Sequence, residues 1–249
     1  MKEGYKEYGS ILPAGGKGTR LRSITGDEIP KSLLNVGGKE LIRYSIDSLT
    51  PDLVNRLVFA VDYKADQIRD WVLRANFPHV VQFSEQTAPG VLGAISAGSN
   101  YVKEDEMIAC NTDEVRARLL LESIINFHER SGRLATMVAT STNRLYRHRL
   151  LQIRENDGLV LSTRLKPEEY RSNPDAIGLV NTGFLILNKR AVEYFDPGHN
   201  TDWGGIIDPL CDAEQLGAYV DPNILYYNVG TPEEFDEAEK ALIQNSSQG

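Results

Sequence analysis

Short apolar runs alternate with amphipathic stretches through the first 140 residues. The first apolar run ends at Ile11-Leu12, and the later runs cover residues 58–61, 80–83, 107–110 and 135–140. Between these predicted strands, the spacing of apolar positions predicts helices over residues 64–75, 93–101 and 119–130. Repeated strand–helix units predict an α/β fold of Rossmann-like type, with a mostly parallel mixed sheet and helices on both faces.

The pattern changes after residue 144 and becomes richer in strands. Residues 150–154 and 159–164 flank the turn Asn156-Asp157-Gly158, which predicts a hairpin, and further apolar runs cover 180–187 and 224–229. A last helix is predicted to begin at Thr231-Pro232, with a capping residue, a proline and acids in its first turn. We expect one domain over 1–249, made of a first half (about 1–140), a β-rich second half (141–230) and a C-terminal helix and tail (231–249).

Composition and charge exclude several classes of protein. With 27 Lys and Arg against 35 Asp and Glu, the net charge is −8, which argues against a nucleic-acid-binding surface. No apolar run is long enough to cross a membrane and the first ten residues lack a signal core, so we expect a cytoplasmic protein. Cys110 and Cys211 are too few for a disulfide framework, and the four histidines show no metal-ligand spacing.

A glycine-rich stretch follows the first predicted strand, and it carries the clearest chemical signal. Residues 15–20 read G-G-K-G-T-R, and three glycines in four positions leave backbone N–H groups accessible to an anion. Arg20 and Lys31 add cationic donors for phosphate oxygens. Neither the dinucleotide fingerprint nor the P-loop pattern fits this stretch. An ordinary strand-to-helix turn is the alternative, but it does not explain the two cations.

The whole string around this loop resembles a known family. L-P-A-G-G-K-G-T-R-L, followed by Ile29-Pro30-Lys31 and the segment 33–39, closely resembles the signature of the sugar-1-phosphate nucleotidyltransferases, which make NDP-sugars. Residues 20–31 and 62–68 look nearest to the guanylyltransferases that act on D-glycero-D-manno-heptose 1-phosphate. The resemblance implies catalytic roles for Arg20 and Lys31. It also implies nucleotide contacts from Ala14, Gly15, Gly16, Lys17, Gly18 and Thr19.

The implied substrates are an NTP, bound by the first half, and a sugar 1-phosphate, bound by the second half. A sugar 1-phosphate is already an anionic nucleophile, so its attack on the α-phosphorus needs no general base. Catalysis then depends on alignment and on neutralisation of charge by a divalent ion and by Arg or Lys.

The resemblance also implies a Mg²⁺ site. Asp113 follows an apolar run directly, which places it at the carboxyl end of a strand, where open α/β sheets bind ligands. The family usually has Gly-Asp here, and Thr112 replaces the glycine. Residues 228–232 resemble the motif D-x-G-T-P, with Asn228 in the Asp position. An amide oxygen is a weaker but still hard ligand, so we expect Asp113 and Asn228 to hold the ion.

The resemblance is weaker on the sugar side. Lys166-Pro167 resembles the end of an E-K-P motif, with Leu165 in place of the Glu, and residues 181–183 resemble N-x-G. These matches imply sugar-phosphate contacts from Lys166, Asn181 and Gly183. The resemblance is strong in the first fifty residues and patchy after Asn143.

Base preference follows from one position. In the family, a polar side chain five residues before a glycine reads the base, and counting back from Gly90 gives Glu85. A carboxylate can accept both N1–H and N2–H of guanine, so GTP is the expected nucleotide. Gln86 is adjacent, and an amide at the base would instead favour a pyrimidine nucleotide such as UTP, dTTP or CTP.

Two readings from other classes remain open. A catalytically silent nucleotide-sugar sensor or partner subunit would explain the departures at Thr112, Leu165 and Asn228. A glycosyltransferase of the same architecture would need a D-x-D metal motif and gives no reason for G-x-G-T-R. The sequence leaves the sugar and any homo-oligomeric assembly open.

Overall fold

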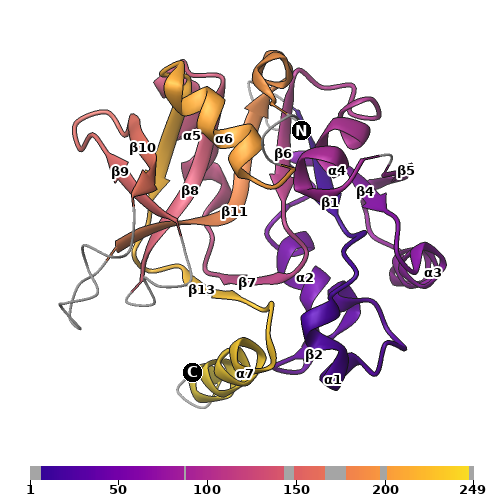
Figure 1. Ribbon diagram of the computed structural model, residues 1–249. Coiled ribbons are helices and arrows are strands. Elements are labelled where there is room, and N and C mark those ends of the chain that lie inside the picture. Colours follow the sequence, from indigo (N-terminus) through magenta and orange to yellow (C-terminus); the bar gives the residue numbers. More distant parts are fainter. Residues whose placement is uncertain (1–6, 87, 143–148, 166–177, 197–200, 247–249) are drawn as a thin grey trace.

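Figure 1 traces the chain in a computed structural model that describes residues 7–86, 88–142, 149–165, 178–196 and 201–246. The main sheet contains β1 (Tyr8–Pro13), β4 (Val54–Val61), β5 (Val80–Glu85), β6 (Glu106–Cys110), β8 (Ala135–Thr142), β9 (Leu150–Ile153), β10 (Val160–Leu165), β11 (Gly178–Asn188) and β12 (Leu216–Val220). Two further ribbons pair β2 (Asn35–Val36) with β3 (Lys39–Glu40) and β7 (Glu114–Ala117) with β13 (Leu225–Asn228).

Six of the described helices lie between strands in the sequence, and the seventh follows the last strand. They are α1 (Arg22–Thr25), α2 (Leu41–Ile46), α3 (Ala65–Ala75), α4 (Gly90–Ser99), α5 (Leu121–Ser131), α6 (Gly204–Asp212) and α7 (Pro232–Ser246). Among the described residues, 3₁₀ segments cover Thr19–Leu21, Lys31–Leu33 and Lys189–Tyr194.

The main sheet is parallel in one part and mostly antiparallel in the other. Strands β6, β1, β4 and β5 are neighbours in that order and run parallel, as β-α-β connections require. The long strand β11 runs antiparallel to β6, β8 and β9, and β12 pairs parallel with β8. The predicted α/β fold with a mixed sheet is therefore confirmed, and its second half is the β-rich part that the sequence predicts.

Apolar side chains alternate between the two faces of this sheet, because successive residues of a strand point in opposite directions. In β4, Phe59 packs on one face and Val58 on the other. In β11, Phe184 lies on the same face as Phe59, and Leu185 lies on the same face as Val58. One face is covered by α2, α3 and α5, and the other by α4 and α6. Two apolar cores, one on each face, thus hold the sheet in place.

A third apolar cluster joins the two ends of the chain. It brings Leu21 and Leu34, from either side of the 3₁₀ turn at Lys31–Leu33, together with Val229 and Ala238. Figure 1 shows α7 beside β2 at the foot of the molecule. The predicted cap of α7 is present, since the backbone N–H of Glu234 donates to Thr231 Oγ1 at 3.3 Å. The C-terminal helix therefore supports the segment that carries Lys31.

The predicted hairpin is confirmed as β9 and β10. The sequence patterns did not predict β2, β3, β7, β12, α1, α2 or α6, which are short or lack a clear periodicity. Among the described residues, every helix is too short or too polar to cross a membrane.

Candidate active site

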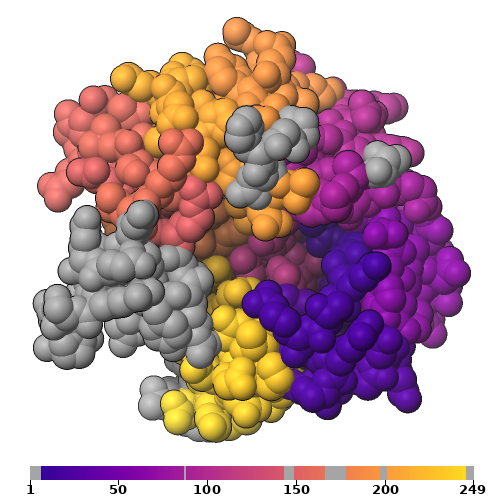
Figure 2. All heavy atoms as spheres, viewed as in Figure 1, coloured from indigo at the N-terminus to yellow at the C-terminus, as the bar shows by residue number. Residues whose placement is uncertain are grey.

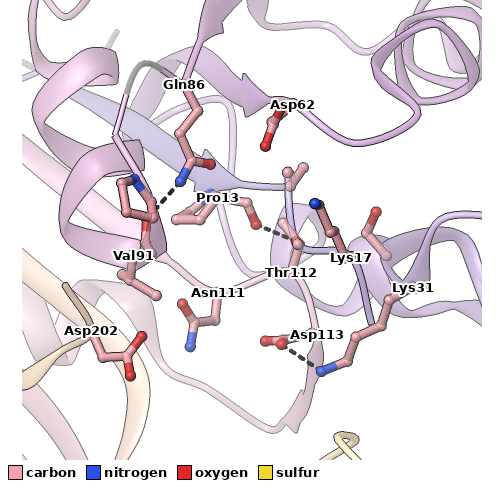
Figure 3. A pocket seen from close by; sticks show the side chains of 16 residues that line it. Pro13, Lys17, Lys31, Asp62, Gln86, Val91, Asn111, Thr112, Asp113 and Asp202 are labelled. Atoms are coloured by element: carbon pink, nitrogen blue, oxygen red, sulfur yellow. Dashed lines mark hydrogen bonds and ion pairs between the residues drawn. The ribbon is translucent and has the colours of Figure 1, made fainter. Parts of the chain in front are cut away.

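A pocket of about 370 Å³ opens beside the carboxyl ends of β1, β4 and β6. Figure 2 shows the surface hollowed between the indigo N-terminal segment and the magenta and orange parts of the chain. Figure 3 shows Asp62 and Gln86 on one side of the pocket and Lys31 and Asp113 on the other. Its lining comprises Pro13, Ala14, Gly15, Gly16, Lys17, Lys31, Ser32, Asp62, Gln86, Pro89, Gly90, Val91, Asn111, Thr112, Asp113 and Asp202.

The glycine-rich loop forms one wall, and close packing explains two of its glycines. A Cβ on Gly15 would lie 2.8 Å from both Asp62 Cβ and Gln86 Oε1. Gly18 has a φ of +57°, and a Cβ there would lie 2.9 Å from Lys31 Cβ. At Gly16 an added Cβ would meet no atom within 4 Å. The loop therefore packs tightly at both ends and leaves open space in its middle, where an anion can approach the backbone.

Lys31 and Asp113 form an ion pair on one side of the pocket (Figure 3). Their Nζ and Oδ2 atoms are 2.6 Å apart, and the exposed fractions of the two side chains are 11% and 38%. Burial by itself would raise the pKa of Asp113, but the Lys31 ammonium outweighs it and holds that pKa below its usual value. The pair thus keeps a carboxylate beside a cation at the mouth of the pocket.

A buried network holds the turn that carries Asp113. Thr112 Oγ1 donates to the carbonyl oxygen of Pro13 at 2.5 Å, which joins the end of β6 to the end of β1. The fully buried Arg116 guanidinium donates to the Asn111 carbonyl and the Glu114 carboxylate. Burial raises the pKa of Glu114 to about 7, although the Arg116 charge acts in the opposite direction. Thr112, which replaces the family's glycine, therefore has a structural role in this chain.

Asn228 lies beside Asp113, although the two are more than 100 residues apart. Asn228 pairs with Glu114 across the β7–β13 ribbon, and the next backbone N–H, of Val229, donates to the Asp113 carbonyl at 3.1 Å. The Arg20 side chain lies near the turn that follows Asn228, because its Nη2 would be 3.2 Å from a Cβ built on Gly230. Neither Arg20 nor Asn228 lines the pocket itself. Within the described parts of the chain, no cluster of three His, Cys, Asp or Glu side chains could hold a metal ion.

Glu85 does not lie where the sequence pattern led us to expect. It is the last residue of β5, its side chain is 66% exposed, and its carboxylate pairs with Arg69 on α3. Gln86 lines the pocket instead. Its Nε2 donates to the carbonyls of Ala88 and Gly90, both at 2.8 Å. The cause is strand alternation, which turns residue 85 outward and residue 86 inward.

Two of the predicted sugar-side residues, Asn181 and Gly183, lie outside this pocket lining. Asn181 Oδ1 accepts the backbone N–H of its own strand neighbour Gly183 at 3.0 Å. Gly183 has a φ of +64°, and a Cβ there would collide with Glu114. Both residues thus shape β11 beside Asn111, whose N–H donates to the Gly183 carbonyl at 2.9 Å. Lys166 falls outside the described residues.

Comparison with known proteins identifies the family. Residues 9–245 match the family described as nucleotidyl transferase. This chain belongs to the nucleotidyl transferase family.

Individual members of the family are similar over most of this chain. The "Mannose-1-phosphate guanyltransferase" of Debaryomyces hansenii is 25% identical over 231 aligned residues, and the match covers 90% of this chain and 62% of that protein. The chain thus spans about 62% of the length of the first curated relatives. HddC from Yersinia pseudotuberculosis, solved in complex with GMP-PN, has a TM-score of 0.72 and 26% identity, and covers 94% of this chain and 99% of its own.

The inositol-1-phosphate CTP transferase from T. maritima has a TM-score of 0.73 and 17% identity, and covers 98% of each chain. At that identity the likeness shows the shared nucleotidyl transferase fold alone.

Sequence reasoning missed several residues that line the pocket of this family member. Asp62 follows the apolar strand β4 directly, so the strand-end rule that selected Asp113 would have found it too. Ser32 is 4% exposed, and its Oγ has no hydrogen-bond partner among the described residues. Asp202 belongs to a segment that contacts the Gly90 turn, because the Leu92 N–H donates to the Thr201 carbonyl at 2.9 Å. No sequence signal pointed to Ser32.

Proposed function

We propose that this chain transfers a guanylyl group from GTP to a sugar 1-phosphate and releases pyrophosphate. The observation that carries the proposal is the Lys31–Asp113 ion pair, which faces an open glycine-rich backbone across one pocket. The pocket combines backbone donors, a cation and a carboxylate, the set of groups that nucleotidyl transfer needs. We name Gly16, Lys17, Lys31 and Asp113 the phosphate end, and Asp62, Gln86 and Gly90 the base end.

The names of related proteins support the choice of substrates. The similar protein of Debaryomyces hansenii is named a mannose-1-phosphate guanyltransferase, and the similar HddC structure contains GMP-PN. HddC supports the guanine nucleotide most directly, since this chain covers 99% of its length. The sugar is proposed as mannose 1-phosphate or a heptose 1-phosphate of the same configuration.

The proposed reaction is an in-line displacement. An oxygen of the sugar 1-phosphate forms a bond to the α-phosphorus of GTP, and the bond from that phosphorus to the bridging oxygen breaks. Pyrophosphate leaves with the electron pair, and no proton has to move because the nucleophile is already anionic. The protein's contribution is therefore alignment and neutralisation of charge.

Each residue of the site has its own role in the proposed reaction. Lys31 donates to phosphate oxygens from the phosphate end, and the backbone N–H groups around Gly16 bind the β- and γ-phosphates. Arg20, near the Gly230 turn, neutralises the departing pyrophosphate. Asn181 and Lys166 are proposed to contact the sugar phosphate, from the β-rich half.

Asp113 and Asn228 offer hard oxygen ligands that fit Mg²⁺. Asp113 Oδ2 contacts Lys31, its side chain remains 38% exposed, and Asn228 is adjacent across the β7–β13 ribbon. Mg²⁺ is usually bound by one or two carboxylates together with substrate phosphates, so a site with a single carboxylate is adequate. When bound, the ion would supply positive charge to the phosphate oxygens.

A pyrimidine nucleotide is the second candidate for the donor. It is favoured by one observation, the amide of Gln86 in the pocket in place of the Glu85 carboxylate. Against it, the Nε2 of Gln86 already donates to two backbone carbonyls, so the side chain cannot give a hydrogen bond to a pyrimidine carbonyl in this arrangement.

The test is a matrix of substrates. The protein is incubated with Mg²⁺, each of GTP, ATP, CTP, UTP and dTTP, and each of several sugar 1-phosphates including mannose and D-glycero-D-manno-heptose 1-phosphates. Pyrophosphate release is measured, and the NDP-sugar is identified by mass. We expect the highest kcat/KM with GTP. A highest value with UTP, dTTP or CTP would establish the pyrimidine alternative, and no release with any pair would support a silent binding protein.

A further inference from the structure

Asp62 and Gln86 form a small constellation at the base end that the glycine loop does not explain. They follow neighbouring parallel strands: Val61 is in register with Glu85, and the Gln86 N–H donates to the Val61 carbonyl at 3.0 Å. Each reaches within 2.8 Å of the position that a Cβ on Gly15 would take. Figure 3 shows both side chains on the same side of the pocket. Two strand ends therefore bring two polar side chains against one glycine.

Gln86 can only accept a hydrogen bond from a ligand. A primary amide carries two hydrogens on its nitrogen, and Nε2 directs them at the Ala88 and Gly90 carbonyls. The same two bonds fix the orientation of the amide, which leaves Oε1 beside Gly15. The Gln86 side chain therefore has no free N–H to donate to a ligand at the base end.

Asp62 is also an acceptor. Its side chain is exposed at the pocket wall, and no ion pair or hydrogen bond to its carboxylate is present among the described residues. A carboxylate repels a triphosphate, which therefore belongs at the opposite side, beside Lys31. The group that approaches Asp62 must then be the base or the ribose, and it must bring donors.

Among the five bases only guanine presents two adjacent donors, N1–H and the N2 amino group, at its pairing edge. Uracil and thymine present one N–H between two carbonyls, whereas adenine and cytosine each place an acceptor beside an amino group. The two side-chain acceptors, the Asp62 carboxylate and Gln86 Oε1, leave the carbonyls or ring acceptors of these four bases opposed and unpaired where they face them.

We propose that Asp62 is the residue that selects guanine, its carboxylate accepting N1–H and N2–H of the base while Gln86 Oε1 provides the neighbouring acceptor. This inference rests on the proposed function, because it assigns the base reader of the same pocket. It gives the role first expected of Glu85 to a different carboxylate, contributed by β4 and not by β5.

The test compares Asp62→Asn with wild type for GTP and for ITP, whose base lacks the N2 amino group. In wild type we expect kcat/KM for GTP to exceed that for ITP by about ten- to a hundredfold, since the bound base of ITP leaves one acceptor of Asp62 facing it without a partner. In Asp62→Asn we expect GTP use to fall at least about tenfold and the GTP/ITP ratio to approach one. Asp66→Asn, at an exposed position of α3, removes the same charge outside the pocket and should leave both values unchanged.

Binding of GTP and ITP is measured in parallel by calorimetry, so that the inference can be judged even if turnover is absent. A GTP/ITP ratio unaltered by Asp62→Asn would overturn the inference and leave the proposed function intact. 2′-Deoxy-GTP is included as a third nucleotide in both assays, and a change confined to the preference for GTP over 2′-deoxy-GTP would assign Asp62 to the ribose, which also overturns the inference. Absence of turnover in wild type, with GTP binding that still depends on Asp62, would overturn the proposed function alone.

Discussion

The two ends of the pocket are built in different ways. At the phosphate end, Gly16 and Lys17 belong to one continuous loop, and Lys31 follows within 15 residues of it. At the base end, Asp62 and Gln86 come from two separate strands and meet only because β4 and β5 pair in parallel register. The first end is a local backbone conformation, and the second is a product of sheet assembly.

The difference teaches where specificity resides in this fold. All nucleoside triphosphates carry the same phosphates, so a compact loop with backbone N–H donors is sufficient to bind that part of any of them. A base is recognised by the donor and acceptor pattern of a few side chains, and strand ends can exchange those side chains without disturbing the loop. The following predictions test this division, from the largest expected effect to the smallest.

Asp113→Asn should reduce Mg²⁺-dependent pyrophosphate release by about a hundredfold or more, because it removes the only carboxylate that we assign to the ion. The measurement is initial rate against Mg²⁺ concentration. Asp47→Asn is the matched control, since Asp47 pairs with Lys39 at 2.8 Å on the surface. If Asp113→Asn keeps the Mg²⁺ dependence of wild type, the ion is held elsewhere.

Lys31→Ala should lower kcat/KM by about tenfold or more for GTP and ITP alike, because it removes a charge-assisted contact of about 1.5 to 3 kcal/mol to the phosphates. The unchanged GTP/ITP ratio distinguishes this end of the pocket from the base end. Lys39→Ala removes a surface ammonium and should preserve activity. A Lys31→Ala enzyme with full activity and normal folding would contradict the assignment.

Gly16→Ala and Gly18→Ala should separate ligand contact from loop folding. The Gly16 change meets no protein atom, so we expect wild-type stability and a loss of kcat/KM of about three- to tenfold, through one displaced phosphate contact. The Gly18 change places a side chain at positive φ against Lys31, and should lower the free energy of unfolding by about 1 to 2 kcal/mol. Urea unfolding and steady-state kinetics of both variants provide the comparison.

The Lys31–Asp113 pair should also produce a pH dependence of stability. The pKa of Asp113 is lowered in the folded protein, so the pair stabilises the fold fully above the pKa of a free aspartate, about 3.9, and this contribution is lost as the pH falls through the lower folded value. The difference in unfolding free energy between wild type and Lys31→Ala should therefore shrink on acidification from pH 6 to pH 3. A constant difference would show that the two charges are not coupled.

Glu85→Gln should have the smallest effect. Glu85 points away from the pocket and pairs with Arg69, so we expect less than about a twofold change in the GTP/UTP ratio and little change in melting temperature. The measurement is kcat/KM with GTP and with UTP, made on Glu85→Gln and on Asp62→Asn under the same conditions. A marked gain in UTP use by Glu85→Gln would restore the original expectation that Glu85 faces the base.

The sequence alone determined those parts of the molecule that depend on near neighbours. Short apolar runs predicted strands such as the one in which Phe59 and Val58 lie on opposite faces, and the Thr231-Pro232 cap predicted the start of α7. The glycine pattern predicted a loop with open backbone beside Lys31. Such features follow from steric and hydrogen-bonding rules that act within a few residues, and those rules can be read from the order of the residues.

Only the tertiary structure decided which side chains meet in the pocket. Whether residue 85 or 86 faces inward depends on where β5 ends, and a shift of one residue reverses the face because the side-chain period of a strand is two. The pairing of Lys31 with Asp113, and the approach of Asp62 and Gln86 to Gly15, depend on the order and register of separate strands. These contacts join residues from distant parts of the chain, and their geometry is set by the packing of the whole sheet, which no local pattern specifies.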